Sequence, residues 1–130
     1  MIAMNIRVFR HEARDDYLET ILRITAAKGY CRAIHIATEL GVTKPSVSVA
    51  LGKLQEEGLI TVDGEKMIRF TPEGLALAEL TYAKHRYFRA FLKSAGVDDE
   101  TAEQEACALE HAISSESFEK LRVRYPAQEK

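Results

Sequence analysis

The sequence predicts a mainly α protein in which a winged helix-turn-helix is followed by a second helical domain. Three observations predict this fold. Apolar residues recur at helical spacing in six segments, most of these segments end at a glycine, and one pair of short β-prone runs separates the third helix from the fourth. The predicted helices cover residues 15–28, 32–40, 43–57, 72–94, 98–112 and 115–124.

Length and composition limit the classes of protein that this chain can belong to. Its 130 residues, 46% apolar and 29% charged, suit one ordinary domain or a small domain with an appended dimerisation segment. No uninterrupted apolar stretch reaches the ~18 residues of a membrane span, and the N-terminus lacks a secretion signal, so we expect a cytoplasmic protein without a membrane partner. Cys31 and Cys107 form no disulfide framework, and Cys31 is expected to be small, partly buried and without a role.

The first half of the chain has the order of elements found in a winged helix-turn-helix. Two short helices meet at a tight turn containing Gly41, and Thr43 and Pro45 begin the second of them as N-cap and first-turn residue. Residues 59–62 and 67–71 then read as strands joined by an Asp63-Gly64 turn. This order predicts a DNA-binding domain over residues 1–71 and a helical domain over residues 72–130.

The third helix offers small hydroxyl and basic side chains, with no acidic residue before Glu56. Such side chains suit phosphates and base edges in a major groove, and Lys66 and Arg69 on the hairpin could add phosphate or minor-groove contacts. The competing interpretation is a small α+β core whose polar helix faces water, and the net charge of −2 favours it. The predicted DNA-binding residues are Thr43, Lys44, Pro45, Ser46, Ser48 and Lys53.

The second half begins with a strong helix start and holds an acidic block. Thr71, Pro72 and Glu73 are typical of a cap, a first-turn proline and an acid near the positive end of a helix dipole. Residues 94–119 contain eight acids and no Lys or Arg. Such a block is consistent with a solvated face, a cation site or a surface for a basic partner.

Residue types that bind metals occur at three places along the chain. Cys107, Glu110 and His111 project from one side of the fifth helix, and their thiolate, carboxylate and imidazole suit first-row transition metals. Spacing alone leaves a second interpretation equally open, namely a buried inert cysteine beside a surface Glu-His pair. Glu103, one turn earlier, is a candidate supporting or second-metal group.

The other two places favour a structural interpretation when each is taken alone. Asp16 and Glu19 avoid the apolar stripe of the first helix and are typical of a solvated face. His85 shares a helix face with apolar residues and is typical of a packed histidine.

Four stretches together resemble the diphtheria toxin repressor family of metal-dependent transcription regulators. They are DDYLETILRI, GYCRAIHIATELGVTKPSVSVALGKLQEEGLI, TPEGLALAELTYAKHRYFRAFL and EACALEHAIS. The resemblance extends from about residue 15 to residue 121, and its specific parts are D-Y-L-E, K-H-R-x-x-x-x-F-L and E-A-C-x-x-E-H. It implies a homodimer that presents two winged helices to a palindromic operator once metal is bound.

The resemblance also implies a set of ligands, which mixes features of two branches. The matching positions are Asp16, Glu19, His85, Cys107, Glu110 and His111. Asp16 and Glu19 are similar to the manganese-sensing branch, whereas Cys107 is similar to the iron-sensing one. Arg89 replaces the iron branch's acidic ancillary ligand. The chain ends before the SH3-like domain of longer members, as in the short manganese regulators.

We therefore expect a repressor of metal-uptake genes that binds double-stranded operator DNA when loaded with Mn²⁺ or Fe²⁺. Zn²⁺ is a possible ion in vitro, and one or two ions per chain are consistent with the ligand set. We expect no enzymatic activity and no small-molecule substrate, because the sequence lacks a nucleophile motif, a phosphate-binding glycine loop and an HExxH helix. Dimerisation would bury a set of apolar residues that could equally belong to the core, namely Leu109, Ile113, Phe118 and Leu121.

Three alternatives remain at this stage. The first is a winged-helix regulator that responds to an organic effector or to oxidation of Cys107. The second is a small metalloenzyme that uses His85, Glu110 and His111. The third is an adaptor without DNA binding whose acidic face contacts a basic partner.

Overall fold

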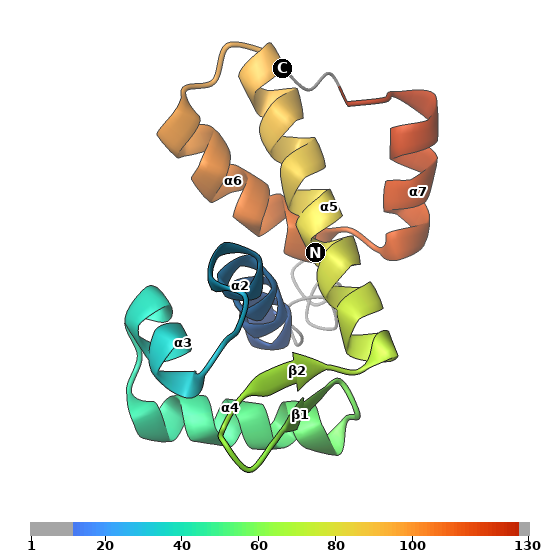
Figure 1. The fold of residues 1–130 in the computed structure, drawn as a ribbon. Helices are drawn as coiled ribbons and strands as arrows, with labels where there is room; N and C mark the ends of the chain where they lie inside the picture. Colours follow the sequence, from blue (N-terminus) through green and yellow to red (C-terminus); the bar gives the residue numbers. More distant parts are fainter. Residues whose placement is uncertain (1–11, 128–130) are drawn as a thin grey trace, which may run out of the picture. The chain divides into compact units, whose positions relative to one another are not determined.

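A computed structural model describes residues 12–127 and has the mainly α fold that the sequence predicts (Figure 1). In these residues, six helices and a two-stranded antiparallel sheet follow one another along the chain. They are α2 (Glu12–Lys28), α3 (Ala33–Leu40), α4 (Lys44–Glu56), β1 (Ile60–Val62), β2 (Ile68–Phe70), α5 (Pro72–Ser94), α6 (Asp99–Ala112) and α7 (Ser115–Arg124). Between residues 12 and 127, no helix combines the length and the apolarity that a membrane crossing requires.

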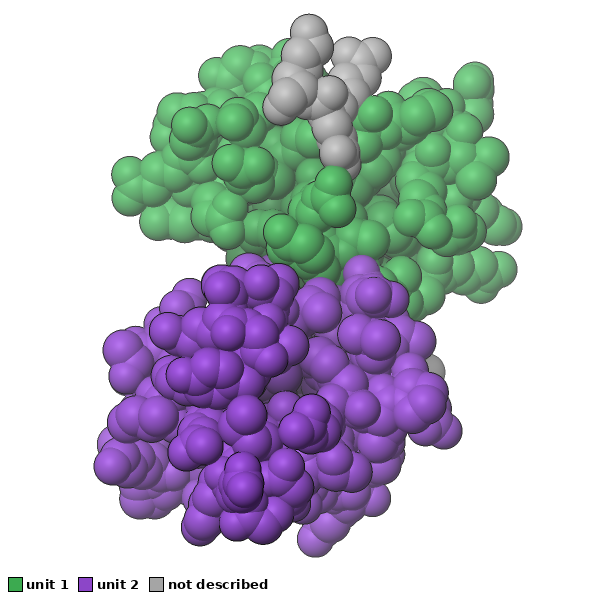
Figure 2. All heavy atoms as spheres, viewed as in Figure 1, with its two compact units in different colours: residues 1–12, 80–130 green, residues 13–79 purple. Residues whose placement is uncertain are grey.

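The chain forms two compact units (Figure 2). One unit contains residues 13–79, and the other contains the described residues 12 and 80–127. The division between the units falls inside α5, eight residues after the predicted domain boundary at residue 71. The assignment of residues 1–71 and 72–130 to separate functional domains stays a prediction.

The unit of residues 13–79 is a winged helix-turn-helix around one apolar core. Leu18, Ile21, Ile36 and Val47 are fully buried there. Val47, Leu51 and Leu54 recur at helical spacing and turn one side of α4 inward. In the sheet, Ile60 pairs with Phe70 and Val62 with Ile68, which places the buried Ile60 and Ile68 on the core side.

Two sequence expectations about this unit need correction. The first helix was expected from about Asp15, but the described helix already includes Glu12, because Glu, Ala and Arg at positions 12–14 all favour helix. Cys31 was expected to be partly buried, but it is fully buried in the core, and burial raises the pKa of its thiol to about 11. Its carbonyl oxygen accepts a 2.9 Å hydrogen bond from the backbone N–H of Ile68, which ties this turn to the wing.

The start of α5 is held against the segment before β1. The hydroxyl of Thr71 accepts a 3.0 Å hydrogen bond from the N–H of Gly74 and donates a 2.6 Å bond to the carbonyl of Gly58. The N–H of Thr71 donates to the carbonyl of Leu59 at 3.1 Å. Gly74 packs so closely against Leu59 that a Cβ atom there would overlap the Leu59 backbone. This contact requires glycine for steric reasons rather than for a positive φ.

The unit of residues 80–127 packs the later part of α5 with α6 and α7. Its apolar core contains the buried residues Tyr87, Phe88, Ala106 and Phe118. Phe118 is fully buried within the chain, which places it in the core rather than in a dimer interface, and Ile113 and Leu121 pack partly against the same cluster. Leu109 is different, because 39% of it is exposed. The buried apolar residues of α6 are Ala102 and Ala106, and Leu109 is not one of them.

Candidate metal centre

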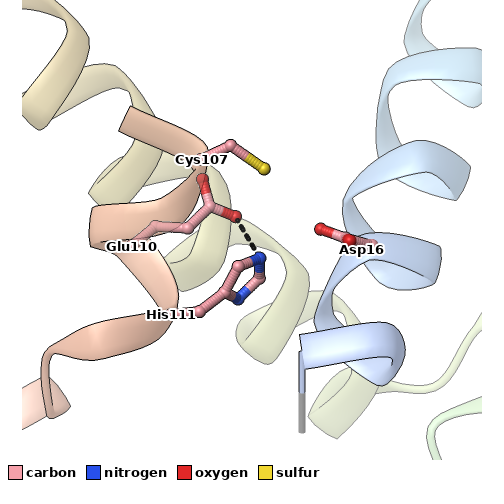
Figure 3. Close-up of side chains that lie close together, drawn as sticks. All are labelled: Asp16, Cys107, Glu110 and His111. Carbon is pink, nitrogen blue, oxygen red and sulfur yellow. Dashed lines mark ion pairs between the residues drawn. The ribbon is translucent and has the colours of Figure 1, made fainter. Parts of the chain in front are cut away.

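Three potential metal ligands project from the last turns of α6 (Figure 3). The helix begins at Asp98, whose carboxylate accepts a 3.1 Å hydrogen bond from the N–H of Thr101; this bond is the main cause of a lowered Asp98 pKa. Cys107, Glu110 and His111 follow at i, i+3 and i+4, and one donor atom of each lies within 4.8 Å of the others. The structure therefore brings together the three residues whose spacing suggested a ligand cluster.

Glu110 lies at the centre of this group. Its carboxylate is fully buried, and Oε1 is 2.8 Å from Nδ1 of His85, while Oε2 is 3.5 Å from Nε2 of His111. Among the described residues, none donates a hydrogen bond to Oε2. A buried carboxylate oxygen without a donor is costly, and a bound cation would compensate for it. The interpretation of Glu110 as part of a surface Glu-His pair is therefore wrong, since Glu110 is 2% and His111 is 3% exposed.

His85 reaches the cluster from α5. It is 6% exposed, and its ring lies between two carboxylates of α6. Nδ1 faces Glu110 at 2.8 Å, and Nε2 faces Oε2 of Glu103 at 2.9 Å. The ring contacts acids rather than only the apolar residues beside it, which is unusual for a histidine that merely fills a core.

Sequence reasoning missed one contact at this site. Nε of Arg89 lies 3.1 Å from Oε1 of Glu103, so the guanidinium and His85 share one carboxylate. The sequence held one signal of this contact: His85 and Arg89 are four residues apart on α5 and so lie on one face of the helix. Glu103, expected as a supporting or second-metal group, has both carboxylate oxygens engaged by protein nitrogens.

The remaining two candidate ligands lie on α2, in the unit of residues 13–79. Asp16 is half-buried and Glu19 is only 7% exposed. The expected solvated face is therefore wrong for Glu19. The reason is that Leu18, Glu19, Thr20 and Ile21 are all buried, so this turn of α2 has no solvated side.

The predicted DNA-binding side chains lie along α4 and all are exposed. The Thr43 hydroxyl caps the helix by accepting a 3.2 Å hydrogen bond from the N–H of Ser46, as predicted. The exposed residues are Thr43, Lys44, Pro45, Ser46, Ser48 and Lys53. Apart from the exposed Val49, the exposed face of α4 is polar and has no carboxylate before Glu56.

The donor atoms of the α5–α6 cluster fit a divalent transition metal. Imidazole nitrogens suit zinc, copper, iron and nickel, carboxylate oxygens suit harder ions such as manganese, and the half-buried Cys107 adds a soft thiolate. Together with the buried Oε2 of Glu110, this set makes the cluster a candidate cation site.

Two domain families match this chain and together cover most of it. The domain described as "Iron dependent repressor, N-terminal DNA binding domain" matches residues 11–68. The domain described as "Iron dependent repressor, metal binding and dimerisation domain" matches residues 71–126.

Individual proteins agree with these matches. The transcriptional regulator MntR of Escherichia coli is 33% identical over 114 residues, which are 88% of this chain and 74% of that protein. The manganese regulator SloR has a solved structure with a TM-score of 0.71 and 30% identity over 86% of this chain and 54% of that one. For ScaR with bound Zn²⁺, the TM-score is 0.71 and the identity 31%, with the same coverage of 86% and 54%.

The chain thus spans about half the length of these solved relatives. The relatives are transcriptional regulators, not enzymes. The two domain matches and the identity to MntR confirm the resemblance found in the sequence. This chain belongs to the iron-dependent repressor family of metal-dependent transcriptional regulators.

Proposed function

We propose that this chain is a cytoplasmic repressor that binds a palindromic operator as a homodimer when loaded with Mn²⁺ or Fe²⁺ and thereby controls metal-uptake genes. Residues 1–71 would read DNA, and residues 72–130 would bind metal and dimerise. The observation that carries the proposal is the buried Glu110 carboxylate between His85 and His111, with Cys107 one turn away in the same cluster. The family membership supports the same function.

The proposed ligands are His85, Cys107, Glu110 and His111, joined by Asp16 and Glu19 of α2. A divalent ion supplies positive charge that the two α2 carboxylates and the α6 ligands would share. Carboxylates of the same charge repel one another, so a bound ion would favour their association. Metal would thus link the residues that read DNA to those that sense the ion. The coupling is reciprocal, so operator DNA should raise metal affinity by the factor by which metal raises DNA affinity.

The exposed polar face of α4 is the proposed reading surface. In a homodimer, two such helices held about one DNA turn (~34 Å) apart would enter successive major grooves. Hydroxyls of Thr43, Ser46 and Ser48 would bond base edges or phosphates, while Lys44 and Lys53 would neutralise phosphate charge. The oxygen ligands favour Mn²⁺ and the thiolate favours a softer ion, so cellular availability would decide between them.

Metal-dependent retention of DNA tests this function directly. Wild-type protein with Mn²⁺ or Fe²⁺ should bind operator-containing fragments, a chelator should release them, and His111→Ala should not respond to either ion. Anaerobic equilibrium dialysis should give one or two ions per wild-type chain and none for His111→Ala. Glu105→Ala removes an exposed acid from α6 and serves as the matched control, with unchanged binding expected.

The same experiment distinguishes the alternatives. If the protein binds DNA with full affinity in chelator and no divalent ion changes that affinity, the signal is not a metal. An organic effector or oxidation of Cys107 would then be the signal. Absence of DNA retention even at low salt would favour an adaptor whose acidic face binds a basic partner.

Replacing Lys44 by Ala should weaken binding to specific and non-specific DNA by about the same factor. An exposed lysine at the start of α4 is placed to neutralise a phosphate, so its removal should lower the slope of log K against log salt by about one phosphate contact per chain. Lys120→Ala is the control, because it removes the same charge from an exposed site on α7. A selective loss of operator affinity would instead mean that Lys44 contacts a base.

A further inference from the structure

The cluster contains a pair of charged residues that the proposed ligand set does not use, Glu103 and Arg89. Oε2 of Glu103 lies 2.9 Å from Nε2 of His85, and Oε1 lies 3.1 Å from Nε of Arg89. Each oxygen of this carboxylate therefore faces a different nitrogen. The pair bridges α5 and α6 on the side of the His85 ring opposite Glu110.

These contacts of His85 with Glu110 and Glu103 restrict how the ring can act. A neutral imidazole carries one N–H, and only the other nitrogen offers a lone pair to a metal. Carboxylates accept hydrogen bonds and do not donate them. If Glu103 accepts the proton of Nε2, Nδ1 is the nitrogen left to bind an ion, and Oε1 of Glu110, 2.8 Å away, can bind the same ion.

We propose that Glu103, oriented by Arg89, is the positioning carboxylate of the metal centre and holds His85 in the Nε2–H tautomer. Arg89 fixes the direction of the Glu103 carboxylate and offsets one of the negative charges that the cluster accumulates. In this role Glu103 acts on His85 rather than as a ligand, with its two oxygens facing nitrogens of His85 and Arg89. This inference rests on the proposed function, since it assigns His85 to metal binding.

The exposure of the pair separates this role from a contribution to folding. The side chains of Glu103 and Arg89 are 58% and 42% exposed, whereas that of His85 is 7% exposed. Ion pairs with this exposure contribute little to stability, so substitutions of Glu103 should leave the fold intact. Hydrogen-bond partners of ligating histidines nevertheless contribute about 10–100-fold to metal affinity, because they set the ring's tautomer and direction.

The test is Mn²⁺ affinity, measured by chelator competition on the full chain. Glu103→Ala should weaken binding about 10–100-fold. Glu103→Gln retains an acceptor oxygen and should recover part of that loss, and Arg89→Gln should give a smaller loss in the same direction. Glu105→Ala removes an equal charge from an exposed position two residues away on α6 and should leave the affinity within about twofold of wild type.

A second readout reports on the ring itself. ¹⁵N NMR of the protein loaded with diamagnetic Zn²⁺ should show the His85 proton on Nε2 in wild type and in Glu105→Ala, and a change in this proton's position in Glu103→Ala. A proton on Nδ1 of His85 in the Zn²⁺-loaded wild type, or wild-type Mn²⁺ affinity in Glu103→Ala while His111→Ala binds none, would overturn the inference and leave the proposed function standing. Absence of binding of Mn²⁺, Fe²⁺ and Zn²⁺ by wild type would overturn both.

Discussion

Glu110→Gln should lower Mn²⁺ or Fe²⁺ affinity by more than about 100-fold and abolish metal-dependent retention of DNA. The substitution keeps the size of the side chain but removes its charge, and it presents an amide NH₂ to a cluster that needs acceptors. The Glu110 carboxylate is fully buried and lies within 3.5 Å of a ring nitrogen of both His85 and His111. Its loss should therefore exceed the 10–100-fold typical of residues that only orient ligands.

Chelator competition measures this affinity, and circular dichroism confirms that the variant remains folded. Glu105→Gln makes the same chemical change at an exposed site on the same helix and should bind metal like wild type. If Glu110→Gln also binds metal like wild type, the buried carboxylate is only a structural partner of His85, and the proposed centre is wrong.

Gly74→Ala should destabilise the winged helix by about 3 kcal/mol, near the upper end for overpacked sites. The added Cβ would overlap the backbone carbonyl of Leu59. That backbone cannot easily move away, because the Leu59 carbonyl accepts a hydrogen bond from Thr71 and the Thr71 hydroxyl bonds the preceding Gly58 carbonyl. The higher helix propensity of alanine offsets only about 1 kcal/mol of this cost.

Urea unfolding measures the change in the free energy of unfolding. Gly52→Ala is the matched control, because Gly52 lies within α4 and a Cβ there meets no atom within 4 Å among the described residues. We expect it to stabilise the protein by up to about 1 kcal/mol. Equal effects of the two substitutions would show that the start of α5 moves away from Leu59 without difficulty.

The sequence predicts most helix ends correctly because the signals that set them are local. Thr43, Asp98 and Ser114 each accept the backbone N–H three residues later, which requires no tertiary contact. The start of α2 is an exception. Asp15 and Asp16 are adjacent acids, and the sequence alone does not reveal whether such acids precede a helix or lie within it.

Burial and contacts between helices could not be predicted in the same way. Helical spacing places Glu19 beside an apolar stripe, but it does not reveal that the whole turn is enclosed. The approach of Glu103 to His85 joins residues 18 apart and depends on how α5 packs against α6. The spacing on α6 alone predicted the group of Cys107, Glu110 and His111, whereas the inclusion of Asp16, Glu19 and His85 depended on the family resemblance.

The two sides of α4 should differ in how fast they change during evolution. Val47, Leu51 and Leu54 fill the core, whereas Ser48 and Lys53 are exposed on the opposite side. Substitutions at exposed positions of this kind usually change stability by no more than about 0.5 kcal/mol. Under the proposed function, a duplicated gene could therefore acquire a different operator through outward residues while the metal response, encoded on other helices, is inherited unchanged.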